Sequence, residues 1–336
     1  MSAPRPPARP PARPRGRPPG RFLQCPSAQR GAALLLAMTL LALVASLAAG
    51  MVWQQWRAVQ VEAAERARAQ AAWILDGAAE WARLIMREDG RTSTIDHGAE
   101  PWATPLAEAR LSTFLAAERD SGADSDFDAF LSGTIRDAQA RYNLRNLVDP
   151  TAGRVKADEL RALERLCAAL GVGADVPARV AAALAQAWGP AAQGAPDRPL
   201  PVTRFEHLAW LGLEPAVVEA LRPHVDVLPR PAPLNLNTAS REAIAAVLDI
   251  DAGTAERLVQ RRQRRAFESP AQVREELPDG FELPEARVAL ASSHFVVVGQ
   301  LRLEERVLEH SVWLYRNEGR VVVEGQRRQA ALAAPP

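Results

Sequence analysis

The chain has 336 residues, of which 48% are hydrophobic, enough for about two domains with apolar cores of their own. The formal net charge is +1, but seven arginines and no acidic residue lie within the first thirty positions. The rest of the chain holds 34 basic and 40 acidic side chains, which argues against a general nucleic-acid surface because such binding depends on neutralising phosphates. The two cysteines, Cys25 and Cys167, cannot form a disulfide framework.

An arginine-rich leader precedes an apolar stretch. Residues 1–22 alternate proline with arginine and alanine, and we expect the leader, residues 1–31, to be disordered and cytoplasmic. The stretch 32–52 is aliphatic and alanine-rich, and at about 1.5 Å per residue it can cross a hydrocarbon core of about 30 Å. The arginines predict that the chain after the span lies outside the cytoplasm, with Trp53 and Trp56 at the far interface.

Three interpretations of this stretch are open. A cleaved secretory signal is one, because "SLAAG" offers small residues to a signal peptidase, although the apolar run exceeds the usual 7–15 residues. It would make the protein secreted and soluble. A plain single-span anchor is the second interpretation, and an anchor made for assembly is the third.

The start of the apolar run favours the third interpretation. Gly31 lies between Arg30 and the apolar residues, and this junction resembles a type IV prepilin-like cleavage site. The resemblance implies that a prepilin peptidase cuts between Gly31 and Ala32 and that Ala32 becomes N-methylated. Most members of that superfamily carry a glutamate at mature position five, where this chain has Leu36. An intramembrane carboxylate is retained where it has a partner, so its absence implies a subunit at the end of a filament.

Beyond Trp56 we expect residues 57–150 to form the first part of a pilin-like domain. An apolar stripe from Val59 through Leu75 to Leu84 predicts a helix that ends near Arg87, before the glycine of "REDG". The region 88–128 is polar and glycine-rich, and one or two strands then follow, ending near Val148.

Three aspartates in that loop region resemble the beginning of a calcium loop: Asp124, Asp126 and Asp128. The sixth position is Ala129 where glycine is required, and the twelfth is Ile135 where a glutamate is required. We therefore interpret these residues as a solvated loop.

Residues 151–286 read as an inserted helical domain. Cys167 lies on the apolar stripe of one of its helices and is expected in the core. The block 234–277 resembles a helix-hairpin-helix unit, with Thr238 or Ser240 capping the first helix and Thr254 opening the second.

Such units are best known for gripping DNA, and this block carries five clustered arginines: Arg257, Arg261, Arg262, Arg264 and Arg265. A membrane-anchored DNA-binding protein of the DNA-uptake class is therefore the alternative function. Asp249 and Asp251 argue against DNA binding, because these carboxylates lie where free backbone amides would be needed to bind a phosphate. We expect no nucleic acid and interpret the arginines as a solvated helix face, partly paired with Glu275 and Glu276.

Strands return over residues 287–326, with "NEGR" as a turn and 327–336 as a tail. The expected fold class is α+β: a long pilin-like N-terminal helix and a small antiparallel sheet, with a large all-α domain inserted between strands.

This order of parts is similar to the K-type minor pseudopilins of the type II secretion system. The resemblance rests on the prepilin junction, "NLRNLVD" before the insertion, "PLNLNTAS" at the hairpin block and the closing "SSHFVVVGQLRLEERV". It implies a single-pass inner-membrane subunit with its bulk in the periplasm, at the tip of a pseudopilus. The implied partners are the I-type and J-type minor pseudopilins and the major pseudopilin.

The resemblance also bears on cofactors and catalysis. Many family members have an aspartate-rich loop with a tyrosine in the helical domain, consistent with calcium binding. The matching region here keeps only Asp197, so we expect no metal or other cofactor. An enzyme is not expected either, because no phosphate-binding loop is present and none of the five histidines lies in a catalytic or metal-spaced motif: His97, His207, His224, His294 and His310.

Overall fold

The computed structural model describes residues 29–111, 129–189, 200–303 and 306–332. The chain divides into two compact units, Met1–Ala67 and Arg68–Pro336, and each is described by itself.

The first unit consists, within the described residues, of the beginning of helix α1 (Gln29–Thr92). Its apolar side chains are exposed, and this is the one described helix that is long and apolar enough to cross a membrane. The hydroxyls of Thr39 and Ser46 donate to the carbonyls of Leu36 and Ala42 at 2.8 Å each. Both polar groups are therefore satisfied inside the helix, as a hydrocarbon environment requires.

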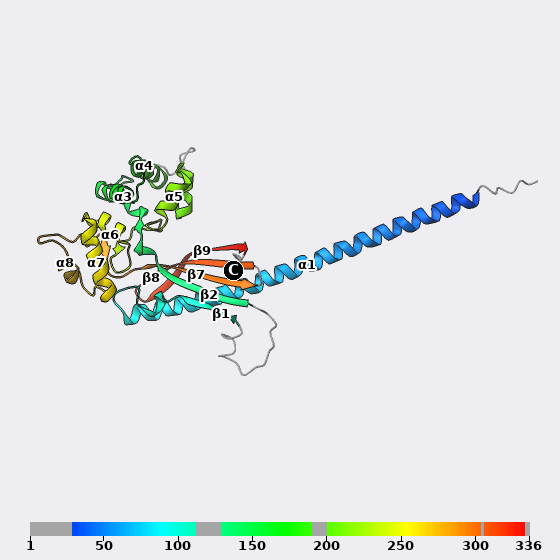
Figure 1. Ribbon diagram of the computed structural model, residues 1–336, viewed down its shortest axis with the longest axis horizontal. Helices are drawn as coiled ribbons and strands as arrows, with labels where there is room; N and C mark the ends of the chain where they lie inside the picture. The colour runs from blue at the N-terminus through cyan, green and yellow to red at the C-terminus, as the bar shows by residue number, and fades with distance from the viewer. Residues whose placement is uncertain (1–28, 112–128, 190–199, 304–305, 333–336) are drawn as a thin grey trace, which may run out of the picture. The chain divides into compact units, whose positions relative to one another are not determined.

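The second unit contains an antiparallel sheet of five strands (Figure 1). Its order is β1-β2-β7-β8-β9, with these bounds: β1 Leu106–Arg110, β2 Ala129–Asp137, β7 His294–Leu303, β8 Arg306–Asn317 and β9 Arg320–Leu332. A tight turn joins β8 to β9 through Glu318 and Gly319, whose φ angles of 49° and 76° are those of the primed hairpin turns. The "NEGR" turn is thus confirmed.

The second half of α1 packs on this sheet. Apolar residues at every third or fourth position of this half are buried and form one stripe against the strands: Ala71, Leu75, Ala79, Ala82 and Met86. The expectation that Leu84 continues the stripe is wrong, since its side chain is 52% exposed.

The helical domain is inserted between β2 and β7, which are neighbours in the sheet. The two strands pair without interruption from Ala129↔Leu303 to Asp137↔Phe295. The domain, residues 138–293, contains helices and short strands with these bounds: η2 Ala138–Ala140, β3 Tyr142–Asn143, η3 Leu144–Leu147, α3 Ala157–Ala169, α4 Val176–Trp188, η5 Phe205–Leu211, α5 Pro215–Leu221, β4 Val225–Asp226, β5 Leu234–Asn235, α6 Arg241–Leu248, α7 Ala252–Arg264, α8 Pro270–Arg274 and β6 Val288–Ala289. Strand β3 pairs with β4 and β5 with β6, both in parallel.

Two boundaries in the middle of the chain differ from the sequence prediction. The insertion starts at Ala138 rather than at residue 151, because Tyr142, Leu144 and Leu147 are buried in the core of the helical domain. Helix α1 ends at Thr92 rather than near Arg87, and Gly90 lies inside it. A side chain at Gly90 would lie 3.0 Å from the Cδ of Arg316, so this glycine gives room to that arginine instead of ending the helix.

The structure also departs from the sequence prediction at strand β1, at the end of β9 and at the short strands β4, β5 and β6, which lie in a domain expected to be all-α. Strand β1 lies in the region expected to be loop, and it is a short edge strand of sequence "LAEAR" that lacks β-branched residues. Residues 327–332 belong to β9 rather than to a tail, because their backbone pairs with β8 as far as Leu332.

Candidate functional site

The residues predicted to act in processing and anchoring lie in the first unit. Gly31, Ala32 and Leu36 are in the first turns of α1 and are exposed. Trp53 and Trp56 are also exposed, with ring centroids 5.6 Å apart. Their roles in cleavage, methylation and interface anchoring stay predictions.

A second exposed apolar surface lies on α1 within the second unit. Trp73, Trp81 and Leu84 are 79%, 56% and 52% exposed. Together with Gly77 they lie on one side of the helix, opposite the buried stripe, and we call these four residues the tryptophan face. Gly77 has no neighbour within 4 Å of where a Cβ would lie, so it leaves a notch between the two indoles. A surface of this kind is typical of helix-helix contacts.

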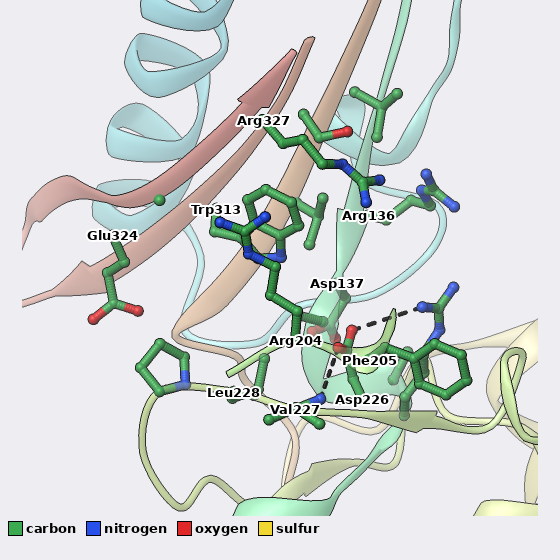
Figure 2. A pocket seen from close by; sticks show the side chains of 18 of the residues that line it. Arg136, Asp137, Arg204, Phe205, Asp226, Val227, Leu228, Trp313, Glu324 and Arg327 are labelled. Carbon is green, nitrogen blue, oxygen red and sulfur yellow. Dashed lines mark hydrogen bonds and ion pairs between the residues drawn. The ribbon is translucent and has the colours of Figure 1, made fainter. Parts of the chain in front are cut away.

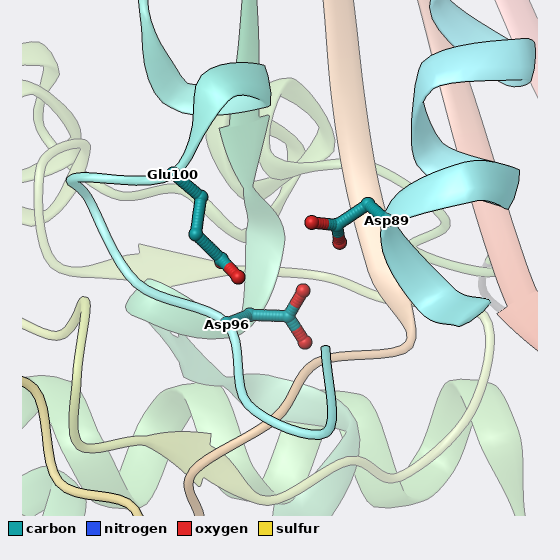
Figure 3. Close-up of side chains that lie close together, drawn as sticks. All are labelled: Asp89, Asp96 and Glu100. Atoms are coloured by element: carbon teal, nitrogen blue, oxygen red, sulfur yellow. The ribbon is translucent and has the colours of Figure 1, made fainter. Parts of the chain in front are cut away.

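Three carboxylates converge where α1 ends, a cluster that sequence reasoning missed: Asp89, Asp96 and Glu100 (Figure 3). The three are close enough to share a cation, but their spacing in the chain matches no metal-binding motif. The fold also brings Arg316 of β8 to them. Arg316 contacts Asp89 and both oxygens of Asp96 at 2.6 Å each. Glu100 accepts from the indole nitrogen of Trp102 at 2.9 Å.

The electrostatics of this cluster fit a structural ion pair. Burial raises the pKa of Asp89 to about 6, and the hydrogen bond from Arg316 opposes that rise. Burial also raises the pKa of Asp96, opposed by the hydrogen bond from the Ser292 amide. Arg316 pairs with both aspartates, so the cluster fastens the end of α1 to β8.

The "PLNLNTAS" stretch joins the helical domain to the sheet through Asp137, the last residue of β2. One carboxylate oxygen of Asp137 accepts from Asn235 at 2.9 Å, from Thr238 at 2.6 Å and from Ser292 at 2.7 Å. The other oxygen accepts from the Gln139 amide at 2.7 Å. Burial raises the pKa of Asp137 to about 6 against these four hydrogen bonds. The motif is therefore a structural link between the two parts.

The helix-hairpin-helix-like block is closed by its own carboxylates. Ser240 caps α6 by accepting from the Ala243 amide, as predicted. The cap of α7 is Asp251 rather than Thr254: one of its oxygens accepts from the amides of Gly253 and Thr254 at 2.9 and 3.0 Å. An acidic side chain already occupies the amides that would bind a phosphate, so this hairpin lacks the means of gripping DNA.

The arginines of α7 are engaged within the domain. Arg261 pairs with Glu276 at 3.6 Å and Arg265 with Glu268 at 2.9 Å, while Arg262 donates to the Leu236 carbonyl. The predicted pairing with Glu276 is confirmed.

Cys167 is buried, with 1% of its surface exposed, and burial raises its thiol pKa to about 11. The prediction that it belongs to the core is confirmed. Asp124, Asp126, Asp128 and Asp197 lie outside the described residues.

These features together define a class of protein. A helix with an exposed apolar first half, continued by a half that packs on an antiparallel sheet, is the architecture of a membrane-anchored pilin-like subunit. The helical domain inserted between β2 and β7 marks a particular group of these pilin-like subunits.

Similar proteins identify that group. Two models of the family described as type II secretion system (T2SS), protein K, match residues 140–230 and 234–297. The type II secretion system protein K of Pseudomonas aeruginosa is 30% identical over 302 residues, which cover 83% of this chain and 86% of the relative. The chain belongs to the protein K family of the type II secretion system, the K-type minor pseudopilins.

A solved structure shares the fold. It is a chain of the crystal structure of the GspK-GspI-GspJ complex from enterotoxigenic Escherichia coli, with a TM-score of 0.56 and 17% sequence identity. The match covers 79% of this chain and 98% of that chain. The expected α+β architecture with its inserted helical domain is thereby confirmed.

Proposed function

We propose that this subunit lies at the tip of the type II secretion pseudopilus and starts its assembly together with I-type and J-type minor pseudopilins. The tryptophan face is the observation that carries this proposal, since large apolar side chains on the free side of a pilin-type helix need a partner helix. The solved complex with the same fold supports the choice of partners, because it contains GspI and GspJ together with GspK. The tip complex would then receive the major pseudopilin for protein export across the outer membrane.

The proposed location is the inner membrane, with the bulk of the chain in the periplasm. Seven arginines ahead of the apolar span support this orientation. Leu36, in place of the glutamate of most pilin-like subunits, supports the tip position because a subunit there has no amine above it to neutralise.

The proposed role is structural and uses no cofactor. Arg316 already occupies the space between Asp89 and Asp96 and pairs with both, which supports a structural ion pair rather than a metal site at this cluster.

Processing by a prepilin peptidase is tested by the mass and N-terminal sequence of the mature protein. We expect the mature chain to start at methylated Ala32 and Gly31→Leu to leave the precursor intact, because the peptidase needs a glycine before the cut. Gly50→Leu, within the same apolar run, is the matched control and should be processed normally. A wild-type protein that retains Met1, or that starts after Ala49, would contradict the prepilin interpretation.

Assembly through the tryptophan face is tested by co-purification of the full chain with its I-type and J-type partners. Trp73→Ala with Trp81→Ala should lower partner recovery by about tenfold or more, as expected when buried aromatic anchors are truncated. Trp210→Ala is the control, since Trp210 is 58% exposed but lies in the helical domain. Undiminished recovery from a folded double variant would sink this assignment of the contact surface.

A further inference from the structure

A cleft of about 1050 Å³ lies between the sheet and the helical domain, and neither the tryptophan face nor the membrane helix is part of it. Its walls come from β2, β8 and β9 on one side and from η3, η5 and the segment around β4 on the other. Figure 2 shows Arg136, Arg204, Arg327 and Trp313 around this space. A cleft of this volume can hold a ligand much larger than a single small ion.

The cleft is lined by six arginines: Arg136, Arg141, Arg145, Arg204, Arg222 and Arg327. Three have carboxylate partners within the described residues: Arg141 pairs with Asp226, and both Arg222 and Arg327 pair with Glu206.

The carboxylates of the cleft are equally engaged. Asp137 accepts four hydrogen bonds, Glu324 pairs with Arg230, and Glu309 accepts from Gln300 and Gln329. Glu324 is thus paired with an arginine that does not line the cleft, while Asp137 and Glu309 are held by uncharged donors.

Arg136, Arg145 and Arg204 have no carboxylate partner in the part of the chain that the structure describes. Arg145 lies over the Trp188 ring at 4.4 Å, and burial lowers its pKa, which marks a partly desolvated cation. Arg136 and Arg204 are exposed and come from opposite walls, β2 and the segment before η5.

One buried donor in the cleft also lacks a partner. The Nε of Arg327 is buried and makes no hydrogen bond within the described ranges, although another nitrogen of this side chain contacts Glu206 at 3.1 Å. Trp188, Phe205 and Trp313 add aromatic surface between the arginines. A ligand with both carboxylate and apolar groups would suit this cleft, because its carboxylates could accept from the free donors while its apolar groups pack on the aromatic side chains.

We infer that this cleft binds an extended acidic polypeptide segment of a partner protein, whose carboxylates pair with Arg136 and Arg204 while apolar side chains pack on the aromatic walls. Charge favours a short segment over a nucleic acid, because the chain after the leader has an acidic excess and repels a long polyanion. The arginines lie on separate elements, so a single small anion would leave most of them unpaired. This inference goes beyond assembly through α1 and does not depend on N-terminal processing.

The test uses the full chain in detergent and fluorescence anisotropy. The probe is a fluorescein-labelled nine-residue peptide, Glu-Leu-Asp-Phe-Glu-Leu-Asp-Phe-Glu, and its comparison is the same peptide with glutamine and asparagine for the acids. We expect the acidic peptide to bind at least about tenfold more tightly, and its affinity to fall as salt rises to about 0.5 M. Arg136→Gln with Arg204→Gln should weaken binding by about tenfold.

The matched control is Arg264→Gln with Arg274→Gln, which removes the same charge from exposed positions outside the cleft and should change affinity by less than about twofold. Equal binding of both peptides, an unchanged affinity in the Arg136/Arg204 variant, or complete displacement by about 10 mM inorganic phosphate would each overturn the inference. Tighter binding of duplex DNA than of the acidic peptide would overturn it as well.

Discussion

At the scale of single residues, a glycine of β7 sets how closely α1 approaches the sheet. Gly133 of β2 and Gly299 of β7 are direct partners in the ladder. A Cβ at Gly299 would lie 3.2 Å from the Cδ2 of Leu75, and one at Gly133 would lie 3.2 Å from the Val298 carbonyl. Both contacts would be tighter than ordinary packing. The fully buried Leu75 therefore occupies space that only a glycine at position 299 leaves open.

We expect Gly299→Ala to lower the free energy of unfolding by about 1–3 kcal/mol, since the added methyl overpacks this contact. Leu75→Ala alone should cost about 2–5 kcal/mol through the cavity it creates. The double variant should lose less than the sum, because removing Leu75 makes room for the methyl. Denaturant unfolding of all four proteins measures the coupling, with Gly98→Ala as a control at a glycine with open space. Additive losses would mean that the two residues do not compete for space.

At the scale of elements, the ion-pair cluster between α1 and β8 makes stability depend on pH. The folded-state pKa of Asp89 is about 6, above its ordinary value of 3.8, because burial disfavours the charged form. Such a group favours the folded state below about pH 4, and that contribution is lost as pH rises through about 6.

Thermal unfolding of the wild type and Asp89→Asn between pH 4 and pH 7 checks this sign. We expect the wild type to lose stability relative to the variant as pH rises, by on the order of 1 kcal/mol because the site is partly open to solvent. Asp175→Asn, at an exposed carboxylate paired with Arg179, is the control. A stability difference between wild type and Asp89→Asn that stays constant, or that changes with the opposite sign, would show that Asp89 is not perturbed in this way.

Strong local patterns predicted most elements, and tertiary contacts explain the errors. The membrane helix, the closing strands and the capping region of α6 each carry a strong local signal in the sequence. Strand β1 and the end of β9 do not, because backbone pairing with a neighbouring strand holds them in place despite weak propensity. The cap of α7 was assigned to Thr254 although Asp251, three residues earlier, is the better acceptor for the first amides.

The candidate site, too, could be predicted from the sequence only where its signal is local. The Gly31 junction and the Leu36 departure can be read from the chain because they are local. The tryptophan face could have been found from its spacing on α1, but only the buried stripe on the opposite side shows that it is free. The cleft could not be predicted, because Arg136, Arg204 and Arg327 meet only after the helical domain has folded against the sheet.

At the scale of the whole molecule, the fold combines two tasks in one chain. The pilin-like part provides the anchor and the tryptophan face, while the inserted domain adds the opposite wall of the cleft. Ser292 connects the Asp137 contacts to the Arg316 contacts: its hydroxyl donates to Asp137, its amide donates to Asp96, and its carbonyl accepts from Arg316.

The insertion between adjacent strands has a consequence for the order of folding. Strands β2 and β7 are partners over their full paired length, yet the whole helical domain separates them in the chain. Closing an unstructured loop of that size costs about 4–5 kcal/mol of chain entropy, whereas a folded domain already holds its two ends together. We expect amides of α3 and α6 to gain protection before those of β7 in pulsed hydrogen exchange during refolding, and the reverse order would refute this. The centre of the pilin-like sheet would then be the last part to close, so the second half of α1 would find no complete surface to pack on until the helical domain has folded.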